Sequence, residues 1–270
     1  MKQRNPRRLV VKVGTSTLTR ETGSLNLQNM EKLARVLSDL EGMGYQVVLV
    51  SSGAIGIGTR KLRLEERPRE LRMKQAAAAV GQCMMVHIYD KLFAEYNRTV
   101  AQILLTGEDV ESPVRSEHLR NTFEALLELG VIPVVNENDS VSSAEIETGQ
   151  AKVLGDNDTL SAIVARLCGA ELLVLFSDID GLYDADPRTH PDARLIHRVE
   201  AITPELEAAA GGAGTWRGTG GMATKLHAAR LALDAGIDMV IANGSRMEAL
   251  YDIVDGKNVG TRFSASLIDN

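Results

Sequence analysis

The stretch Leu172-Leu173-Val174-Leu175-Phe176 decides the fold of this chain. Every position in it is apolar, and Ser177-Asp178 follow directly. A strand that alternates apolar and polar residues buries one face. A strand that is apolar throughout is buried on both faces, as in parallel sheets that are covered by helices. We therefore expect this run to be an inner strand of a parallel sheet.

Similar short apolar runs recur along the 270 residues and alternate with patterns of helical period. Further strands are predicted at 9–13, 46–50, 100–105, 131–135 and 237–241, and helices at 27–40, 70–96, 121–129, 158–167 and 226–235. This alternation indicates an α/β fold, with a mainly parallel sheet that is covered on both faces. In such sheets ligands bind beyond the carboxyl ends of the strands.

Composition excludes several classes of protein. Hydrophobic residues make up 44% of the chain and charged residues 24%, which is ordinary for a globular domain with a sizeable core. The two cysteines, Cys83 and Cys168, lie in apolar helical surroundings and are expected to be buried thiols rather than a disulfide or a metal site. The net charge of −6 argues against a general nucleic-acid binder.

Targeting segments are not evident either. The apolar run Leu9-Val10-Val11 is interrupted by Lys12, so it is too short for a signal peptide, and no window approaches a membrane span. We expect a cytoplasmic protein that binds neither membrane nor nucleic acid.

Small polar and acidic residues follow the predicted strands, at the edge where a ligand site is expected. These segments are Gly14-Thr15-Ser16, Ser51-Ser52-Gly53-Ala54, Asn136-Glu137-Asn138-Asp139, Ser177-Asp178 and Asn243-Gly244-Ser245. The Ser52-Gly53 turn offers hydroxyl and N–H donors without the spacing of a nucleophile elbow, so it fits a carboxylate or oxyanion better than a nucleophile. The alternative is a tight turn that packs helix on strand.

Two lysines stand out as phosphate ligands. Lys12 lies near the end of a buried strand, where a charge is costly unless it is paired or functional; the alternative is that its stem reaches the surface. Lys225 ends the glycine-rich stretch Gly218 to Lys225, whose backbone N–H groups precede a helix. The stretch is not a Walker A loop, because Thr224 precedes the lysine and Leu226 follows it. A plain surface connection is the alternative.

Two clusters of acids and amides are the remaining candidates, Asn136 to Asp139 and Gly155-Asp156-Asn157-Asp158. A helix N-cap by Asp156 or Asn157 would explain one residue of the second cluster but not three. The excess suggests binding of a ligand ammonium, metal coordination, or orientation of the lysines by Asp158. The segment from Ser177 to Pro187 lacks the final Glu of a calcium loop and fits a nucleotide-contacting turn better.

Taken together, these motifs resemble the amino acid kinase family, and most closely its members that phosphorylate glutamate. The strings that carry the resemblance run in the family's order over nearly the whole chain: Val11 to Ser16, Ser52 to Ile55, Lys74 to Ala76 with Ala79 to Gln82, Gln102 to Thr106, Pro133 to Asp139, Gly155 to Ala162, Gly181 to Tyr183 with Asp186 to Arg188, and Gly218 to Lys225.

The resemblance implies a three-layer α/β/α sandwich and transfer of phosphate from ATP to the γ-carboxylate of L-glutamate, with Mg²⁺ required, as the first step of proline synthesis. By the family pattern, Lys12 and Lys225 flank the transferring phosphoryl group and Asp158 orients them. The implied glutamate-binding residues are Ser52, Gly53, Asp139, Asp156 and Asn157. The implied nucleotide-binding residues are Lys12, Gly14, Ser177, Asp178, Thr219, Gly220, Gly221, Met222, Ala223, Thr224 and Lys225.

The resemblance also implies one domain over 1–270. Its N-terminal part would bind mainly glutamate, and its part from about residue 170 mainly nucleotide. Family members are commonly inhibited by L-proline and form dimers or tetramers, and the next enzyme of the pathway is a further candidate partner. Many bacterial members carry a C-terminal PUA domain, which we expect to be absent because the chain stops at Asn270. Residues Glu147 to Ala151 lengthen the loop near the glutamate region and leave proline inhibition open.

Three other functions compete with this interpretation. A sister kinase could act on another carboxylate or on carbamate, but the acid–amide clusters and the Ser52 turn favour free glutamate over N-acylated glutamate. A non-catalytic glutamate or proline sensor would not need Lys12, Lys225 and Asp158 together. A nucleic-acid role is disfavoured by the net charge of −6 and by the expected absence of a PUA domain.

Overall fold

The computed structural model of the chain describes residues 7–20, 24–141, 154, 156–187, 189–204, 206 and 221–264. In this part of the chain eight strands form one sheet, in the order β3-β4-β2-β1-β5-β7-β8-β6. The strands are β1 (Arg8–Val13), β2 (Gln46–Ser51), β3 (Val100–Leu105), β4 (Ile132–Glu137), β5 (Leu172–Ser177), β6 (Arg198–Val199), β7 (Asp238–Asn243) and β8 (Thr261–Phe263). All neighbours are parallel except β7 and β8, which are antiparallel.

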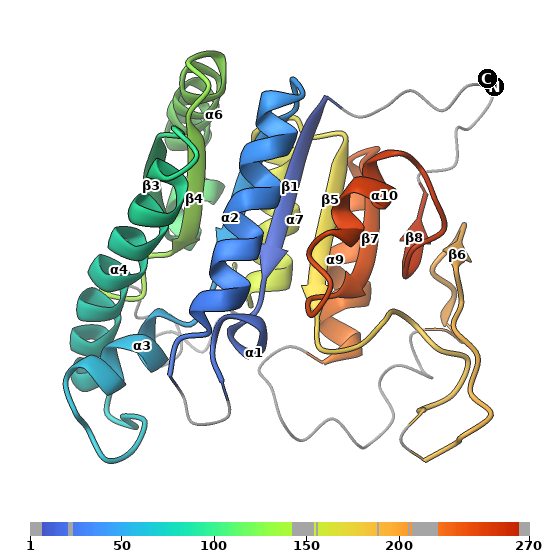
Figure 1. Cartoon of the computed structure of the whole chain (residues 1–270), viewed down its shortest axis with the longest axis horizontal. Helices are drawn as coiled ribbons and strands as arrows, with labels where there is room; N and C mark the ends of the chain where they lie inside the picture. Colours follow the sequence, from blue (N-terminus) through green and yellow to red (C-terminus); the bar gives the residue numbers. More distant parts are fainter. Residues whose placement is uncertain are drawn as a thin grey trace.

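Helices cover both faces of the sheet, which gives the three layers of an α/β/α sandwich (Figure 1). The helices are α1 (Thr15–Leu18), α2 (Leu27–Gly42), α3 (Ala54–Lys61), α4 (Leu71–Ala94), α5 (Gly107–Glu111), α6 (Pro113–Glu128), α7 (Asn157–Leu167), α9 (Met222–Asp234) and α10 (Ala249–Val254). The predicted fold class is therefore confirmed. Among the described residues, none of the helices has the length and apolar character needed to cross a bilayer.

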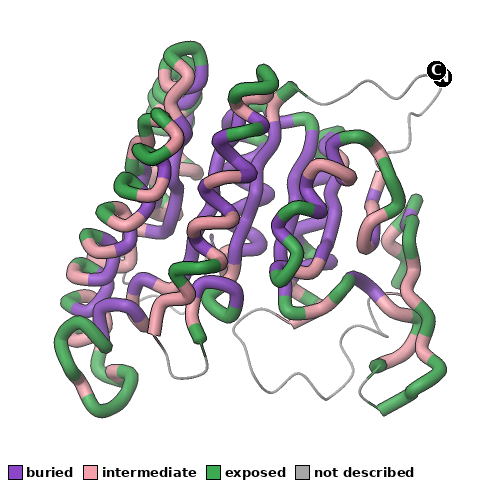
Figure 2. The backbone as a smooth tube through the Cα atoms, viewed as in Figure 1, coloured by how far each residue is buried: buried purple, intermediate pink, exposed green. Residues whose placement is uncertain are grey.

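Two hydrophobic cores lie on opposite faces of the sheet. One packs α2, α4 and α10 against it, and the other packs α6, α7 and α9. The burial map shows the inner strands buried along their length, with exposed residues on the outer sides of the helices (Figure 2). In β1, Val10 belongs to the α7 side while Val11 and Val13 belong to the α2 side. Because side chains alternate along a strand, Lys12 faces α7 and α9.

Close helix packing supports the turn that leads into α3. Helices α3 and α4 cross at Gly58 and Gly81. A Cβ on Gly58 would lie 1.8 Å from the carbonyl oxygen of Ala77, and one on Gly81 would lie 1.8 Å from that of Ala54. Only glycine lets the two backbones approach this closely. The Ser52-Gly53 turn therefore enters a helix whose position is tightly restrained.

Several predicted boundaries are wrong for local reasons. Helix α6 begins at Pro113, eight residues before the predicted start, because Ser112 caps it and proline suits the first turn. Strands β6 and β8 were not predicted, since two or three residues carry no readable periodicity. Helices α1, α3, α5 and α10 were also missed, each being eight residues or fewer.

The prediction for the cysteines is half right. Cys168 is buried and Cys83 is exposed on the outer side of α4. Burial raises the pKa of the Cys168 thiol to about 12. The apolar neighbours of Cys83 in the sequence lie on other faces of the same helix, so an apolar window does not establish burial for each of its members.

Candidate active site

Three charged side chains meet at the carboxyl end of β1. The Lys12 Nζ lies 2.5 Å from Oδ1 of Asp158, and the Lys225 Nζ lies 3.1 Å from Oδ2 of the same carboxylate. Exposure is 8% for Lys12, 1% for Asp158 and 5% for Lys225. We call these three residues the charged trio. Two ammonium groups against one carboxylate leave the trio with one positive charge in excess.

The fold brings the trio together from three distant parts of the sequence. Lys12 points from β1 toward α7 and α9. Asp158 lies in the first turn of α7, and Lys225 lies in the first turn of α9. Both helices begin at this edge of the sheet, so the positive ends of their dipoles also lie here. The site therefore favours an anion.

The ionisation of Asp158 follows from the two lysines. Burial alone would raise its pKa, but the charges of Lys12 and Lys225, and the hydrogen bonds that they donate, hold the pKa below its usual value. The carboxylate is therefore charged at neutral pH and holds both ammonium groups by charge-assisted hydrogen bonds.

The start of α9 differs from the predicted loop. Gly221 is the N-cap, and Met222, Ala223, Thr224 and Lys225 form the first helical turn rather than the end of a loop. Of the other nucleotide candidates in that stretch, Thr219 and Gly220 lie outside the described residues, as does Gly218.

Thr224 adds a fourth polar side chain beside the trio. Its Oγ1 lies 3.1 Å from Oδ2 of Asp158 and 2.8 Å from the carbonyl oxygen of Gly221, so the single hydroxyl proton has two acceptors. The threonine thereby links the N-cap of α9 to the carboxylate that holds both lysines.

The turns after β1 and β2 touch each other beside Lys12. Ser52 Oγ donates to the carbonyl oxygen of Val13 at 3.1 Å and lies 3.4 Å from Oγ1 of Thr15. Gly53 has φ 98°, and a Cβ there would lie 3.2 Å from Thr15 Oγ1. A Cβ on Gly14 would lie 3.6 Å from the Lys12 Nζ. Both turns therefore keep the space next to the lysine free of bulk.

The second acid–amide cluster is divided between structure and site. Asp156 is the N-cap of α7, and its Oδ1 accepts from the backbone N–H of Asp158 at 2.7 Å and of Thr159 at 3.1 Å. This is the capping alternative that the sequence offered. Asn157 is the first residue of α7, and its Oδ1 is buried without a hydrogen-bond partner. Unpaired buried acceptors are rare in native proteins, so this one calls for a ligand or water.

The first cluster belongs partly to a strand. Asn136 and Glu137 are the last residues of β4 rather than the beginning of a loop, and both are buried. Asp139 is half-buried in the turn that follows. The structure thus brings this cluster to the same sheet edge as the trio, two strands away from β1.

Ser177 and Asp178 lie on the other side of β1, at the end of β5. The Ser177 Oγ donates to Oδ1 of Asp178 at 3.0 Å. The backbone N–H of Gly244, after β7, donates to the Ser177 carbonyl oxygen at 2.7 Å, and a Cβ on Gly244 would lie 2.7 Å from Oγ1 of Thr17. Along the edge, the acid–amide cluster, the Ser52 turn, Lys12 and the Ser177 turn therefore follow the strand order β4, β2, β1, β5.

A comparison with known protein families fits this arrangement. The model of the amino acid kinase family matches residues 7–243, which include the whole trio. The chain belongs to the amino acid kinase family.

Close relatives within the amino acid kinases are named glutamate 5-kinase. The protein from Clostridium perfringens (strain 13 / Type A) is 56% identical over 262 residues, which are 97% of each chain. The one from Clostridium tetani (strain Massachusetts / E88) is 57% identical and covers 95% of this chain and 94% of its own. The one from Listeria innocua serovar 6a is 50% identical, over 97% of this chain and 94% of its own.

Solved structures share the fold at much lower identity. UMP kinase from Bacillus anthracis matches with a TM-score of 0.66 and 17% identity, covering 97% of this chain and 98% of that one. An isopentenyl phosphate kinase also matches with a TM-score of 0.66 and 17% identity, over 95% of this chain and 100% of that one. These likenesses concern the amino acid kinase fold alone.

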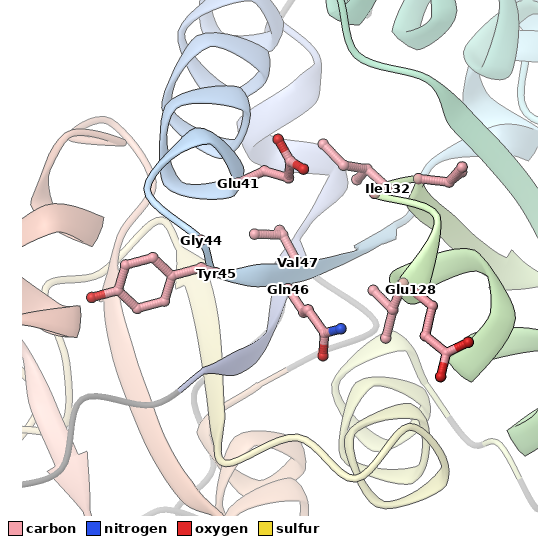
Figure 3. A pocket seen from close by; sticks show the side chains of 10 residues that line it. Glu41, Gly44, Tyr45, Gln46, Val47, Glu128 and Ile132 are labelled. Atoms are coloured by element: carbon pink, nitrogen blue, oxygen red, sulfur yellow. The ribbon is translucent and has the colours of Figure 1, made fainter.

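The opposite edge of the sheet carries a hollow of about 200 Å³ that is separate from this site. It lies where β2 and β4 begin, between the ends of α2 and α6, and Glu41, Gln46 and Glu128 line it (Figure 3). Ligand sites of open α/β sheets lie beyond the carboxyl ends of strands, whereas this hollow is at the amino ends. The charged trio, by contrast, lies at the carboxyl ends of the strands, where such sites are expected.

Two polar residues near the site stand in motifs that the sequence singled out, but they were assigned no role of their own. Thr15 joins the β1 and β2 turns, and Gln82 of α4 donates from Nε2 to the backbone oxygen of Glu137 at 3.2 Å. The sequence signal for Gln82 was a polar residue directly after a glycine, among the apolar residues of the helix predicted at 70–96. The structure shows that this glycine, Gly81, is closely packed.

Proposed function

We propose that the chain is a glutamate 5-kinase, which transfers the γ-phosphoryl group of ATP to the γ-carboxylate of L-glutamate and yields L-glutamyl 5-phosphate and ADP. This reaction is the first step of proline biosynthesis. The observation that carries the proposal is 56% identity over 97% of both chains with a relative named glutamate 5-kinase. The charged trio supplies the chemistry that such a reaction needs.

The reacting groups explain why two lysines suffice. The γ-carboxylate is a nucleophile at neutral pH, so the site needs no general base. Phosphoryl transfer then depends on in-line positioning and on neutralising the charge of the transferring oxygens. Lys12 and Lys225 supply that charge from opposite oxygens of Asp158. Because the lysines are held before substrate arrives, they need no reorganisation during the reaction.

The strand order supports a division of the site on either side of β1. The glutamate side comprises the Ser52-Gly53 turn on β2 and Asp139 beyond β4, with Asp156 and Asn157 at the start of α7. The nucleotide side comprises Ser177 and Asp178 after β5 and the residues around the start of α9. Lys12 lies between the two sides, where the γ-carboxylate and the γ-phosphate must meet.

Mg²⁺ enters the proposal with ATP. Among the described residues no group of three or more His, Cys, Asp or Glu side chains could hold a metal ion. Both oxygens of Asp158 already contact lysines. This donor set fits Mg²⁺, which keeps several waters and binds largely through substrate phosphates. The ion would add positive charge to the phosphate oxygens.

Assembly and regulation form part of the same proposal. By family resemblance we propose a homodimer or homotetramer, inhibition by L-proline, and a contact with the enzyme that consumes the acyl phosphate. Light scattering of the purified protein tests the first, and proline titration of the kinase reaction tests the second. If the enzyme is monomeric and insensitive to proline, the proposals of an oligomer and of proline inhibition are both wrong.

The reaction itself is tested by trapping its product. Hydroxylamine converts an acyl phosphate into a hydroxamate, so the protein is incubated with ATP, Mg²⁺ and one of L-glutamate, N-acetylglutamate, aspartate or carbamate. We expect hydroxamate from glutamate. If another carboxylate reacts and glutamate does not, the substrate is wrong. If none reacts while glutamate binds, the protein is a sensor.

A further inference from the structure

Gln82 has a buried side-chain amide, of which the nitrogen is hydrogen-bonded and the oxygen is not. Its Nε2 donates to the backbone oxygen of Glu137, the last residue of β4, at 3.2 Å. Its Oε1 is buried and has no hydrogen-bond partner, although the residue is only 5% exposed. Rotating the amide by 180° would turn an oxygen toward the Glu137 carbonyl, so this contact fixes the orientation. The unpaired atom is therefore an acceptor.

A second unpaired acceptor lies on the neighbouring residue of the strand. Asn136 Oδ1 is also buried without a partner. Alternation along β4 puts Asn136 on the side of Ile132 and Val134, which pack in the core shared with α4. Figure 1 shows α4 lying along β3 and β4 on this face of the sheet. The helix and the strand thus each bring an amide oxygen to the carboxyl end of β4.

The position of Gln82 is rigid. The preceding residue, Gly81, packs so closely on α3 that a Cβ there would lie 1.8 Å from the Ala54 carbonyl oxygen. Helix α3 in turn follows the Ser52-Gly53 turn of the site. The amide of Gln82 is therefore held relative to both the β2 turn and the end of β4.

The chemistry of the missing partner follows from the atoms present. Unpaired buried acceptors require a donor, and each one left alone destabilises the protein. Carboxylate and phosphate groups only accept hydrogen bonds, whereas an ammonium group has three N–H donors and no acceptor. Of the groups on an amino-acid substrate, only the α-ammonium therefore suits these oxygens.

We propose that Gln82 Oε1, together with Asn136 Oδ1, accepts hydrogen bonds from the α-ammonium group of the amino-acid substrate, and so selects a free amino acid over an N-acylated or deaminated one. The inference rests on the proposed function, because it presumes that the substrate is glutamate. It assigns a specificity role to a helix residue outside the turns that follow the strands.

The test compares Gln82→Met with Gln28→Met. Methionine matches the length of glutamine but has no strong acceptor, and Gln28 is exposed on α2, so it controls for the same chemical change. In Gln82→Met we expect the KM for glutamate to rise about 10- to 100-fold, since a hydrogen bond to a charged group is lost. The KM for ATP should stay near that of the parent. The melting temperature without ligand should fall only slightly, because the bond to the Glu137 carbonyl is lost while a buried unpaired acceptor is removed.

Glutarate separates recognition of the ammonium from general positioning. It keeps both carboxylates and lacks the ammonium, so its inhibition constant should be the same in the parent and in Gln82→Met. An unchanged KM for glutamate overturns the inference, and so does an equal loss of glutarate and glutamate affinity. If glutarate inhibits neither enzyme, a lower melting temperature together with a raised KM for ATP overturns it, because Gln82 is then structural. A parent that does not phosphorylate glutamate refutes the proposed function instead.

Discussion

Replacing Asp158 by asparagine is the most informative perturbation of the site, because it keeps the shape of the side chain and removes its charge. The carboxylate is 1% exposed and contacts Lys12 Nζ at 2.5 Å and Lys225 Nζ at 3.1 Å. In the variant the amide oxygen can face one ammonium group, so the amide NH₂ must face the other. Two buried ammonium groups then lie close together, and the negative charge that they shared is gone.

The expected loss of stability is large for a single substitution. Removing one partner of a buried ion pair costs about 3–5 kcal/mol, chiefly because a buried charge stays uncompensated. At about 2–4 °C per kcal/mol for a domain of this size, the melting temperature should fall by about 6–20 °C. Turnover should fall as well, since Asp158 holds both lysines in place.

The assay is thermal unfolding of four proteins: the parent, Asp158→Asn, Lys12→Ala and the double variant. Lys12→Ala keeps the pair between Asp158 and Lys225, so it should fold normally and lose turnover by about 10²-fold or more. In the double variant the excess charge is reduced, so its stability should exceed that of Asp158→Asn by about 1 kcal/mol or more.

Two results would refute this reasoning. If Asp158→Asn melts at the temperature of the parent, the trio contributes no net electrostatic stability. If the double variant loses the sum of the two single losses, the residues are not coupled, and the contacts at 2.5 Å and 3.1 Å carry no mutual energy.

Acid titration of stability gives an independent check. The pKa of Asp158 in the folded protein lies below its ordinary value of 3.8. The unfolded chain therefore binds this proton first, and the stabilisation is present above pH 3.8 and lost as the pH falls through the lower folded pKa. The stability gap between the parent and Asp158→Asn should be constant near neutral pH and shrink below about pH 4. A gap that persists in acid would contradict the ionic origin of the effect.

Other predictions concern packing and thiol chemistry. Gly58→Ala should destabilise the protein by about 1–3 kcal/mol or more, because its Cβ would overlap the Ala77 carbonyl, whereas Gly56→Ala in the same helix meets nothing within 4 Å and should be neutral or stabilising; equal melting temperatures would disprove this contrast. Cys83 should react readily with a thiol reagent in the native protein, and Cys168 only after unfolding, since it is buried with a pKa raised to about 12; two native thiols in the titration would contradict this.

Much of the architecture was readable from the sequence because burial on both faces leaves a direct trace in composition. An apolar run such as Leu172 to Phe176 cannot be exposed without penalty, so its place inside a parallel sheet follows from local information. Long helices likewise carry a period of their own. Boundaries were less accurate, because a few residues decide them. Because Ser112 caps α6, this helix begins eight residues before the predicted start. Because Gly221 caps α9, this helix begins at Met222 and includes Lys225 in its first turn.

The types of residue at the site were also predictable from single positions. Lys12 is out of place in a buried strand, and the start of α7 has more acids and amides than one helix cap needs. Neighbouring residues in the sequence did not show that this cluster has two roles, helix capping and pairing with the lysines. Asp156 and Asp158 are two residues apart, yet one caps a helix and the other pairs with lysines, because the first turn of α7 points them in different directions.

The sequence by itself determined the inner strands of the sheet, the long helices that cover it and the residue types at its carboxyl edge, since these depend on apolar patterns and on charges that are costly to bury. The family resemblance implied that Asp158 orients Lys12 and Lys225, but the residue patterns did not show which charges meet, and the tertiary structure decided it. Lys12 and Lys225 are far apart in the chain. They converge on Asp158 because α7 and α9 pack on the same face of the sheet, and the Lys12 side chain of β1 points to that face. The unpaired oxygens of Gln82 and Asn136 were likewise invisible beforehand, because a missing hydrogen-bond partner is a property of neighbours in space.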